Sequence, residues 1–487
     1  MIVGGGVSGL GTALFLTRRG HDVTIIERDR TPMPATAAEA FEWDRRGAPQ
    51  VRHSHALLGR LRKLLVDHHP DVLEALLDEG ATEIRMANRK PATLDDQSPR
   101  DGDDDLVMLA SRRTTFEWVM RRIVTEEGLA KLKTGSGVTG LVTDRDIGMD
   151  RSSAGVPRVT GVTLEDATVV KADIVIAAHG RRSDVPNWLE AIGTQPLVET
   201  IEDTGIAYYS RFYELGPGQN FPSGDRLIGG DLTYLKYGVF WGDNATFSVT
   251  LATADDDRTL RALKDGELFD QVARSLPATA DWLNAGAAPI TKVHSMAGLL
   301  NRRRDYLSNG QPIVLGFHAV GDAHIATNPM HGRGCSTGMW QGLLVADAID
   351  AHPDDPAEQS RAFCAAVDEH IAPWYAASVT SDRSSRRAIE RSRAEAAGED
   401  VPELDAADFM SSVIREGLSP ASRSDAVVWR AFMRMINLLD PPESLMAPDV
   451  ANRIFAVWQD RENRPTPEPL GPERDELLSL LGLTDNP

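Results

Sequence analysis

MIVGGGVSGLGTALFLTRRGHDVTIIERD, residues 1–29, opens the chain and points to its fold class. A short apolar strand leads into Gly4, Gly6 and Gly9, an amphipathic helix follows, and a second strand ends at Glu27. This order is typical of the βαβ unit that binds a dinucleotide. Gly4 permits a tight turn, Gly6 lets the backbone approach a pyrophosphate, and Gly9 lets the helix pack on the strand. The helix N-terminus attracts phosphates and Glu27 accepts hydrogen bonds from ribose hydroxyls, so we expect a bound dinucleotide.

Composition excludes several classes of function. The chain has 487 residues, 41% hydrophobic and 25% charged, which is ordinary for a globular protein with two or three substructures. Its net charge of −20 argues against general binding to nucleic acid or to an anionic membrane. Cys335 and Cys364 form neither a disulfide framework nor a metal site, so we expect a reducing cytoplasm and no metal. We also expect no signal peptide and no integral membrane segment.

The pattern along the chain predicts an α/β fold, α+β overall, in which one domain is discontinuous. Buried parallel strands are expected in ADIVIAAHG (172–180) and PIVLGFHAVGD (312–322), whereas residues 200–255 alternate with the period of an antiparallel sheet. We therefore expect a Rossmann-like dinucleotide-binding domain, an inserted antiparallel β-sheet substrate domain and a mainly helical C-terminal region. The dinucleotide-binding domain is predicted to comprise residues 1–62, 106–185 and 290–350, and the substrate domain residues 63–105 and 186–289. The helical C-terminal region is predicted over residues 351–487.

Charged and aromatic stretches complete the organisation. DGDDD (101–105) is interpreted as a solvated turn, and the charged stretch 381–400 as an exposed helix. Aromatic residues alternate between positions 208 and 247. About half of them should face cores, and the others are candidates for an apolar substrate wall.

A second ligand-binding pattern lies in VLGFHAVGDAHIATNPMHGRGCSTGMWQG, residues 314–342. Asp322 follows the expected strand and is placed to bond a ribityl hydroxyl chain. A loop with Pro329, Gly332 and Gly334 then opens a helix, whose free N–H groups and positive dipole end suit the N1–C2=O edge of a reduced flavin.

The same segment also contains a rival pattern. Gly334-Cys335-Ser336-Thr337-Gly338 satisfies G-x-S-x-G, the nucleophile elbow of hydrolases. That motif requires a strand directly before the serine, and here a Pro- and Gly-rich loop precedes it. We therefore favour the flavin interpretation over a hydrolase.

The glycine turn, the Gly-Arg-Arg-Ser turn after residue 179 and the Asp322 loop occur in an order that resembles the FAD-dependent monooxygenases of the p-hydroxybenzoate hydroxylase type. The likeness covers most of residues 1–350. VRHSHALLGR (51–60) and residues 302–323 are most similar to bacterial epoxidases of secondary metabolism and to squalene-epoxidase-like enzymes. The resemblance implies that FAD is bound by Gly4, Gly6, Gly9, Glu27, Arg28, Arg113, Val138, Asp322, Pro329, Gly332 and Gly334.

Some of these assignments are specific. The resemblance places Arg113 at the ribityl or phosphate region of FAD and the backbone of Val138 against adenine. His179 stands where the family usually has Asp or Thr, so we assign no contact with the phosphates or with a pyridine nucleotide to this turn. The segment Arg52–His55 is expected beside the flavin, with no assigned role.

The resemblance implies a flavin monooxygenase as the leading function. NADH, NADPH or a partner reductase would reduce FAD, and O₂ would add to it as a C4a-hydroperoxide. One oxygen atom would then pass to a small, largely apolar aromatic or alkene substrate by hydroxylation or epoxidation. No catalytic side chain is nominated, because the cofactor carries the chemistry. The alternatives are an FAD-dependent dehydrogenase or double-bond reductase of the geranylgeranyl reductase type, and a non-catalytic FAD-fold binding protein.

Overall fold

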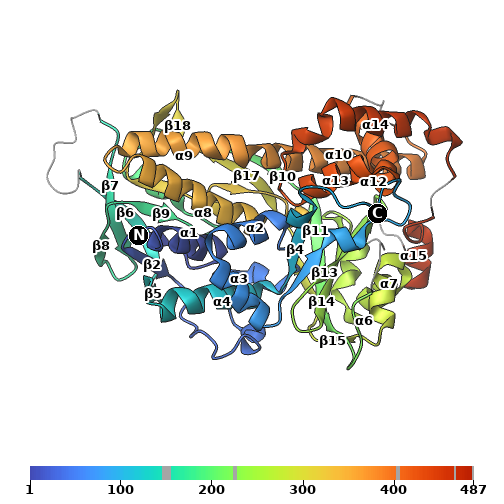
Figure 1. Ribbon diagram of the computed structural model, residues 1–487, viewed down its shortest axis with the longest axis horizontal. Coiled ribbons are helices and arrows are strands. Elements are labelled where there is room, and N and C mark those ends of the chain that lie inside the picture. Colours follow the sequence, from blue (N-terminus) through green and yellow to red (C-terminus); the bar gives the residue numbers. More distant parts are fainter. Residues whose placement is uncertain (145–154, 223–227, 402–405, 466–467, 485–487) are drawn as a thin grey trace.

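The computed structural model describes residues 1–144, 155–222, 228–401, 406–465 and 468–484. A parallel sheet with its helices occupies one end of the molecule, and an antiparallel sheet with further helices occupies the other (Figure 1). The long helix α10 (Ala372–Ala397) reaches from the first part toward the second. This arrangement confirms the expected α/β class with an added antiparallel sheet and a helical C-terminal region.

The parallel sheet is built from short strands that lie far apart in the sequence. Every neighbouring pair in it is parallel, which requires crossover connections rather than tight hairpins between the strands. Its strand order is β20 (Phe317–Ala319), β9 (Val175–Ala177), β1 (Ile2–Val3), β2 (Val23–Glu27) and β5 (Ala130–Thr134). Because the strands are parallel, the C-terminal ends of β1, β2 and β20 lie at the same edge of the sheet, with β9 between β20 and β1.

Helices α1 (Val7–Thr17) and α8 (Gly334–Ala351) pack closely against each other beside this sheet. Glycines permit the close approach: a Cβ on Gly342 would lie 2.8 Å from Thr12 Oγ1, and a Cβ on Gly11 would lie 3.2 Å from Met339 Cγ. The same buried core includes residues of α2 (Gly59–His68), α3 (Pro70–Asp78), α4 (Arg113–Glu126) and α9 (Pro356–His370).

The antiparallel sheet carries the alternating aromatic residues. Tyr209, Tyr213, Trp241 and Phe247 are buried in one core with Trp282, as expected for the inward half of the pattern. The strands are β12 (Gly229–Asp231), β13 (Leu235–Trp241), β14 (Thr246–Ala254), β11 (Ile206–Glu214) and β15 (Ala288–Pro289), with β16 (His294–Met296) beside β11. Helices α6 (Gly266–Ser275), α7 (Pro277–Asn284) and α15 (Arg474–Leu480) contribute to the same core.

Smaller sheets and helices connect these parts. The expected hairpin after α4 forms a three-stranded meander of β6 (Val138–Thr143), β7 (Val159–Leu164) and β8 (Val169–Lys171). A second three-stranded sheet contains β10 (Val198–Asp203), β17 (Leu300–Asp305) and β21 (Ile325–Ala326). The remaining elements are β3 (Thr82–Arg85), β4 (Val107–Ala110), β18 (Leu307–Ser308), β19 (Gln311–Pro312) and α5 (Val185–Ala191).

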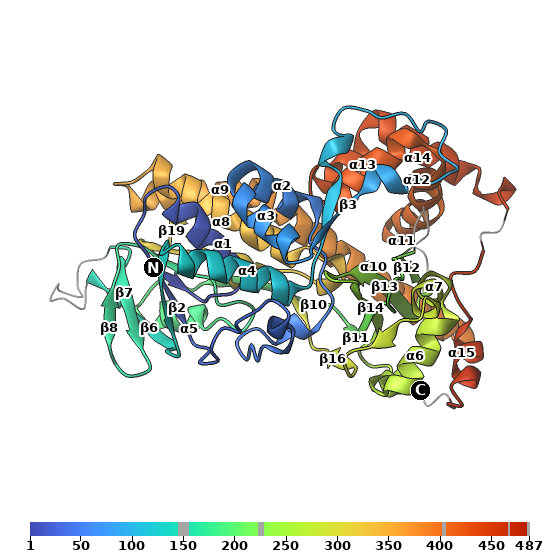
Figure 2. The ribbon, with the colours of Figure 1, turned by 60° about the horizontal axis from the view of Figure 1, so that its bottom comes forward.

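The C-terminal region is helical and contacts both other parts. Figure 2 shows α13 and α14 on one side of the antiparallel sheet and α6 and α15 on the other. In the described ranges α10 is followed by α11 (Ala406–Ser412), α12 (Ser419–Ser424), α13 (Ala426–Ile436), α14 (Pro448–Gln459) and α15.

The prediction that residues 101–105 form only a solvated turn is wrong at Asp103. Its side chain is buried, and it pairs with Lys90 Nζ at 3.0 Å and with Arg430 Nε at 2.8 Å. A buried carboxylate requires such partners, and one of them lies on α13. Likewise, the expected helix over residues 381–400 belongs to α10, but its Asp382 is buried rather than exposed.

Candidate functional site

The first glycine turn has the geometry of a phosphate cradle. Gly4 has a φ of +107°, and a Cβ there would lie 2.7 Å from the carbonyl oxygen of Ala178. A Cβ on Gly9 would collide with the carbonyl oxygen of Gly4. Gly6 caps the N-terminus of α1, and a Cβ there would have no atom within 4 Å. The turn is therefore closed on the protein side and open where the N-terminus of α1 presents its N–H groups.

Glu27 ends β2 as a buried carboxylate with partners on both oxygens. Its Oε2 accepts from the Gly5 amide and its Oε1 from the Asp29 amide, each at 3.0 Å. Arg45 Nη2 donates to Oε2 at 3.3 Å, and Arg121 Nη2 lies 3.6 Å from the same oxygen. Burial alone would raise the pKa of Glu27, but Arg45, the amides and Arg121 hold that pKa below its ordinary value. The carboxylate therefore stays ionised as a hydrogen-bond acceptor.

A row of alternating charges on α4 lies beside this turn. Arg113, Glu117 and Arg121 follow each other at intervals of four residues, so they share one face of the helix. Arg113 Nη1 lies 3.2 Å from His55 Nε2, and Glu117 Oε1 pairs with Arg45 at 2.8 Å. The sequence predicted a role for Arg113 but not for Glu117 or Arg121, although their spacing on an expected helix was a usable signal.

The Asp322 loop meets the glycine turn directly. Added Cβ atoms on Gly321 and on Gly338 would both collide with Ser8, in the first turn of α1. Asp322 lies in a short turn after β20 and pairs with Arg181 Nε at 3.0 Å. The two ends of the predicted cofactor site, separated by about three hundred residues, are thus one continuous surface.

The helix that follows this loop begins as expected. Pro329 starts a single 3-10 turn, Gly332 has a φ of +64°, and α8 begins at Gly334. A Cβ on Gly334 would have no atom within 4 Å, so the N-terminus of α8 is open as that of α1 is.

The remaining predicted residues lie at the edges of this surface. Val138 is the first residue of β6 and is partly buried, whereas the Arg28 side chain is exposed. His179 stacks on Trp188 with ring centroids 4.9 Å apart, and neither of its ring nitrogens has a partner among the described residues. Burial lowers the pKa of His179 to about 4, so the ring is neutral.

The buried polar atoms fit an anionic, polar cofactor. Within the described ranges, Arg45 Nη1, Arg113 Nε and Ser336 Oγ are buried and have no hydrogen-bond partner. Protein interiors rarely leave such groups unpaired, and a bound ligand is one way to satisfy them. Ser336 itself lies in the first turn of α8, without a preceding strand, so the nucleophile-elbow interpretation is excluded by geometry.

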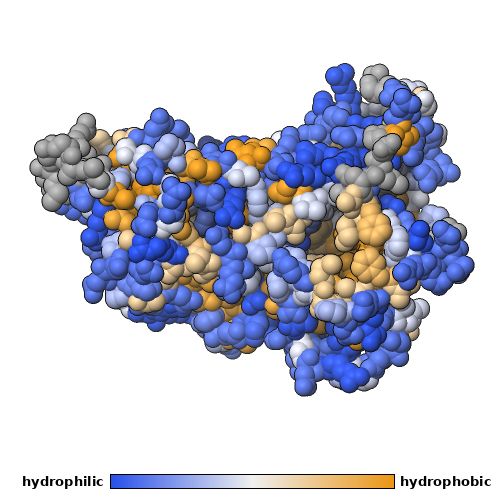
Figure 3. Space-filling view, turned by 90° about the horizontal axis from the view of Figure 1, so that it is seen from above, coloured by the Kyte–Doolittle hydropathy of each residue, from blue (hydrophilic) through white to orange (hydrophobic). Residues whose placement is uncertain are grey.

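A cavity of about 250 Å³ opens where the antiparallel sheet meets the Pro329 loop. Much of its wall is apolar or aromatic, which suits a small organic molecule. In the space-filling view, apolar residues gather around a hollow in the right half of the face (Figure 3). Its lining includes His53, Tyr208, Tyr237, Phe240, Met296 and Met330. Tyr208, Tyr237 and Phe240 belong to the aromatic set that was expected to contribute a substrate wall.

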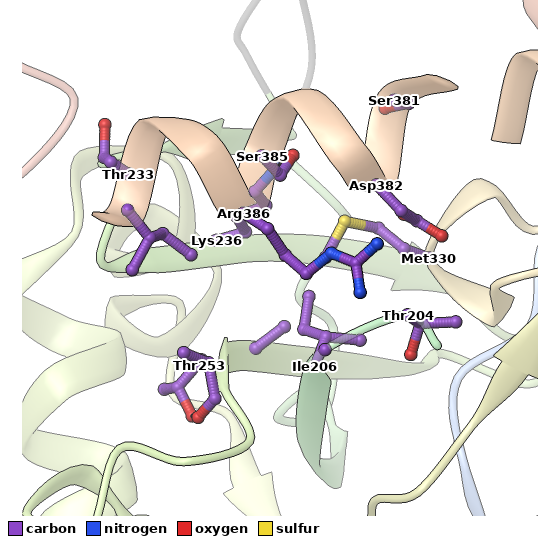
Figure 4. A pocket seen from close by; sticks show the side chains of 14 residues that line it. Thr204, Ile206, Thr233, Lys236, Thr253, Met330, Ser381, Asp382, Ser385 and Arg386 are labelled. Atoms are coloured by element: carbon purple, nitrogen blue, oxygen red, sulfur yellow. Dashed lines mark hydrogen bonds between the residues drawn. The ribbon is translucent and has the colours of Figure 1, made fainter. Parts of the chain in front are cut away.

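A second, much smaller cavity of about 20 Å³ lies between α10 and the antiparallel sheet. Figure 4 shows Asp382, Ser385 and Arg386 reaching from α10 toward Lys236 and Met330, of which the last two also line the larger cavity.

Beside it, Asp382 joins α10 to the Pro329 loop. Its oxygens accept from Asn301 Nδ2 and Asn328 Nδ2, each at 2.7 Å, and Asn328 in turn bonds Tyr208. This buried network was not apparent in the sequence, because a single Asp in a charged helix has no distinguishing pattern. It connects the C-terminal region to the wall of the larger cavity.

None of the helices in the described ranges has both the length and the apolar character needed to cross a bilayer. Nowhere in those ranges do three or more His, Cys, Asp or Glu side chains gather as metal ligands.

Comparison with known proteins agrees with this geometry. Residues 1–74 match the family described as FAD dependent oxidoreductase. The chain is 24% identical over 381 residues to Protein Rv3254 of Mycobacterium tuberculosis, covering 72% of this chain and 73% of that protein. It is 25% identical over 386 residues to a kynurenine 3-monooxygenase of Xanthomonas oryzae pv. oryzae, covering 75% of this chain and 74% of that enzyme.

A solved structure shares the fold over most of the chain. PqsL of Pseudomonas aeruginosa, described as "a probable FAD-dependent monooxygenase", superposes with a TM-score of 0.57 at 15% identity. The match covers 80% of this chain and 96% of PqsL, and PqsL is also known in complex with 2-aminobenzoylacetate. At this identity the likeness establishes the fold. The protein is therefore an FAD-dependent oxidoreductase built on the fold of the FAD-dependent monooxygenases.

Proposed function

We propose that this protein is a monooxygenase that inserts one atom of O₂ into a small, largely apolar aromatic or alkene substrate. The observation that carries the proposal is the position of the 250 Å³ cavity, which is bounded by Pro329 and Met330. That loop opens α8 directly beside the glycine turn of α1. A substrate in the cavity would therefore lie against the segment that is proposed to hold the flavin.

The proposed FAD contacts follow from the geometry of the two helix starts. Gly4, Gly6, Gly9, Glu27 and Arg28 would hold the ADP half, since the α1 turn is open and Glu27 is ionised. The backbone of Val138 would contact adenine. Arg113 and Asp322 would contact the phosphate or ribityl region, and Pro329, Gly332 and Gly334 would lie along the ring system.

The bound flavin would supply the redox chemistry and the activation of O₂. The protein would bind, orient and enclose the substrate: the aromatic walls exclude water, and the N-terminus of α8 favours negative charge on the ring system. NADH, NADPH or a partner reductase is proposed as the electron source. Cys335 and Cys364 are both buried free thiols, which suits a reducing compartment such as the cytoplasm.

A spectrum and an oxygen electrode test the proposal. The purified protein should show the visible absorption of bound flavin, either as isolated or after reconstitution with FAD. It should consume O₂ with NADH or NADPH faster when candidate phenols, arylamines or alkenes are added. A flavin-loaded protein that reduces an alkene without consuming O₂ would instead be a double-bond reductase. A colourless protein that cannot be reconstituted would contradict the proposal outright.

A further inference from the structure

The segment Arg52-His53-Ser54-His55 has no role in the proposed function so far. In the structure its residues face two different environments, the charged residues of α4 and the larger cavity. His55 faces Arg113, as described above, whereas His53 and Ser54 line the larger cavity. His53 also lies near His294, with ring centroids 6.3 Å apart. His53 is therefore the imidazole in this segment that is placed to meet a substrate.

A chain of four hydroxyl groups leads away from His53. Its Nδ1 lies 3.2 Å from Ser210 Oγ, and Ser210 Oγ lies 2.8 Å from Thr250 Oγ1. Thr250 donates to Ser54 Oγ at 2.7 Å, and Ser54 donates to Ser248 Oγ at 2.7 Å. Ser210 lies on β11, while Thr250 and Ser248 lie on the adjacent strand β14.

The directions of these bonds fix the tautomer of the imidazole. A hydroxyl has one proton to donate. Since Thr250 donates to Ser54, it accepts from Ser210, and Ser210 must then accept from His53. The proton of the neutral ring therefore sits on Nδ1, and Nε2 keeps its lone pair. No hydrogen bond described for this part of the chain uses Nε2.

Burying these hydroxyl groups costs free energy, and apolar side chains would fill a purely structural role at lower cost. Ser210 and Ser248 are 1% and 2% exposed, on the face of the sheet opposite to the apolar core that holds Tyr209, Tyr213 and Phe247. Buried hydroxyls are tolerated when they are hydrogen-bonded, but they stabilise a core less than apolar groups do. The hydroxyl of Tyr237, another lining residue, is already bonded, to the carbonyl of Leu470 at 2.5 Å. His53 Nε2 is thus a free acceptor on a largely apolar wall.

We infer that His53, held by this hydroxyl chain, is the hydrogen-bond acceptor that selects substrates bearing an O–H or N–H group, such as phenols and arylamines. The inference rests on the proposed function and narrows its substrate class, since a plain alkene offers no donor to Nε2. His53 would touch the substrate through Nε2, and Ser210 and Thr250, which also line the cavity, would act as positioning residues for the imidazole.

The inference requires no proton transfer to His53. Burial, with a further contribution from His294, lowers the pKa of His53 to about 4, so the ring is neutral at neutral pH. A neutral acceptor draws the substrate proton toward itself and leaves more electron density on the aromatic ring. That favours electrophilic oxygenation of the ring, and the O–H or N–H bond stays intact in the bound state.

Two probes of matched size test the inference. FAD-loaded protein is titrated with 2-naphthol and with 2-methylnaphthalene, and dissociation constants are read from the change in flavin absorbance. Wild-type protein should bind 2-naphthol about fivefold to tenfold more tightly, the usual effect of one hydrogen bond. Equal affinity for the two probes, or no binding of either, would overturn the inference. Because FAD loading is measured first, that outcome is distinct from a failure of the proposed function.

Three variants sharpen the result. His53→Leu should remove the preference for 2-naphthol, and His53→Asn should do the same while keeping a donor toward Ser210. His53→Gln should restore part of the preference, because its side-chain oxygen can stand near the position of Nε2. Met296→Leu, at another lining residue, is the matched control and should shift both affinities together. Retained preference in His53→Leu and His53→Asn would assign the selection to another group.

Discussion

Glu27 illustrates how single residues prepare the cofactor site. Its carboxylate is held by two backbone amides and two buried arginines, so it is oriented before any ligand arrives. Arg45 has an unpaired Nη1, and its pKa, which burial would lower, is raised by Glu117, Glu27 and Asp29. The arrangement keeps both charges in place at the end of β2, where a ribose and its phosphates would bind.

Glu27→Gln should weaken FAD binding by about 1.5–3 kcal/mol, which is about tenfold or more in affinity, because a charged hydrogen bond is lost. Fluorescence titration of apoprotein with FAD measures the change. Asp22→Asn, at an exposed acidic residue directly before β2, serves as the control and should leave affinity unchanged. Equal FAD affinity in Glu27→Gln and wild type would contradict the ribose contact.

At the scale of elements, the contact between α1 and α8 determines whether the two halves of the site meet. It depends on glycines, because Thr12 lies too close to Gly342 for a larger side chain without adjustment. The packing of α1 on α8 fixes the relative position of the loops before the two helices. The glycine turn and the Asp322 loop can form one surface only while that position is kept.

Gly342→Ala should lower the free energy of unfolding by about 1–3 kcal/mol, the typical cost of forcing extra atoms into a packed contact. Urea denaturation of both proteins gives the difference. Gly140→Ala provides the control, because a Cβ there would have no atom within 4 Å. A loss of the same size in both variants would mean that the helix contact is not the cause.

A second element-scale contact joins α13 to the buried Asp103. Asp103→Ala leaves Lys90 and Arg430 without their buried partner, so we expect a loss of about 3 kcal/mol or more in unfolding free energy. Asp104→Ala, at the exposed neighbour, should be close to neutral. Proteolysis of the C-terminal helices should be faster in Asp103→Ala than in wild type, and equal rates would contradict the docking role.

How far the sequence predicts the structure depends on how local the signal is. The glycine turn, the strands around residues 176 and 318, and the start of α8 at Gly334 have strong local patterns, and the structure contains them. Asp103 was predicted to be solvated because its partner Arg430 is 327 positions away, and no local sequence pattern predicts that contact. Arg45 lies in a loop without periodicity, so its place beside Glu27 also depends on tertiary packing.

At the scale of the whole molecule, buried neutral histidines make stability depend on pH. Burial lowers the pKa of His318 to about 4 and that of His324 to about 3, from 6.5 in the unfolded chain. Below about pH 6.5 the unfolded chain binds protons that the folded protein excludes, so stability is full above that pH and falls as the pH drops. His331 and His53 act in the same direction.

Urea unfolding should therefore show a declining free energy of unfolding between about pH 6.5 and pH 5, above the range in which most carboxylates titrate. Each such histidine contributes up to about 1.4 kcal/mol per pH unit. His318→Gln should reduce the slope, even if it lowers stability at every pH. The variant lacks one group that binds a proton in the unfolded chain and stays neutral in the folded protein. An unchanged slope in His318→Gln would show that other groups dominate.

The bond from the Tyr237 hydroxyl to the carbonyl of Leu470 spans 233 positions of the chain. Tyr237 lines the larger cavity, so one side of that cavity is anchored by a segment the ribosome makes much later. During synthesis, β13 can pair with β14 long before this anchor exists. The cavity thus acquires its final outline only after residue 470 has been made, and a chain stopped before that residue would present an altered wall to any molecule that entered it.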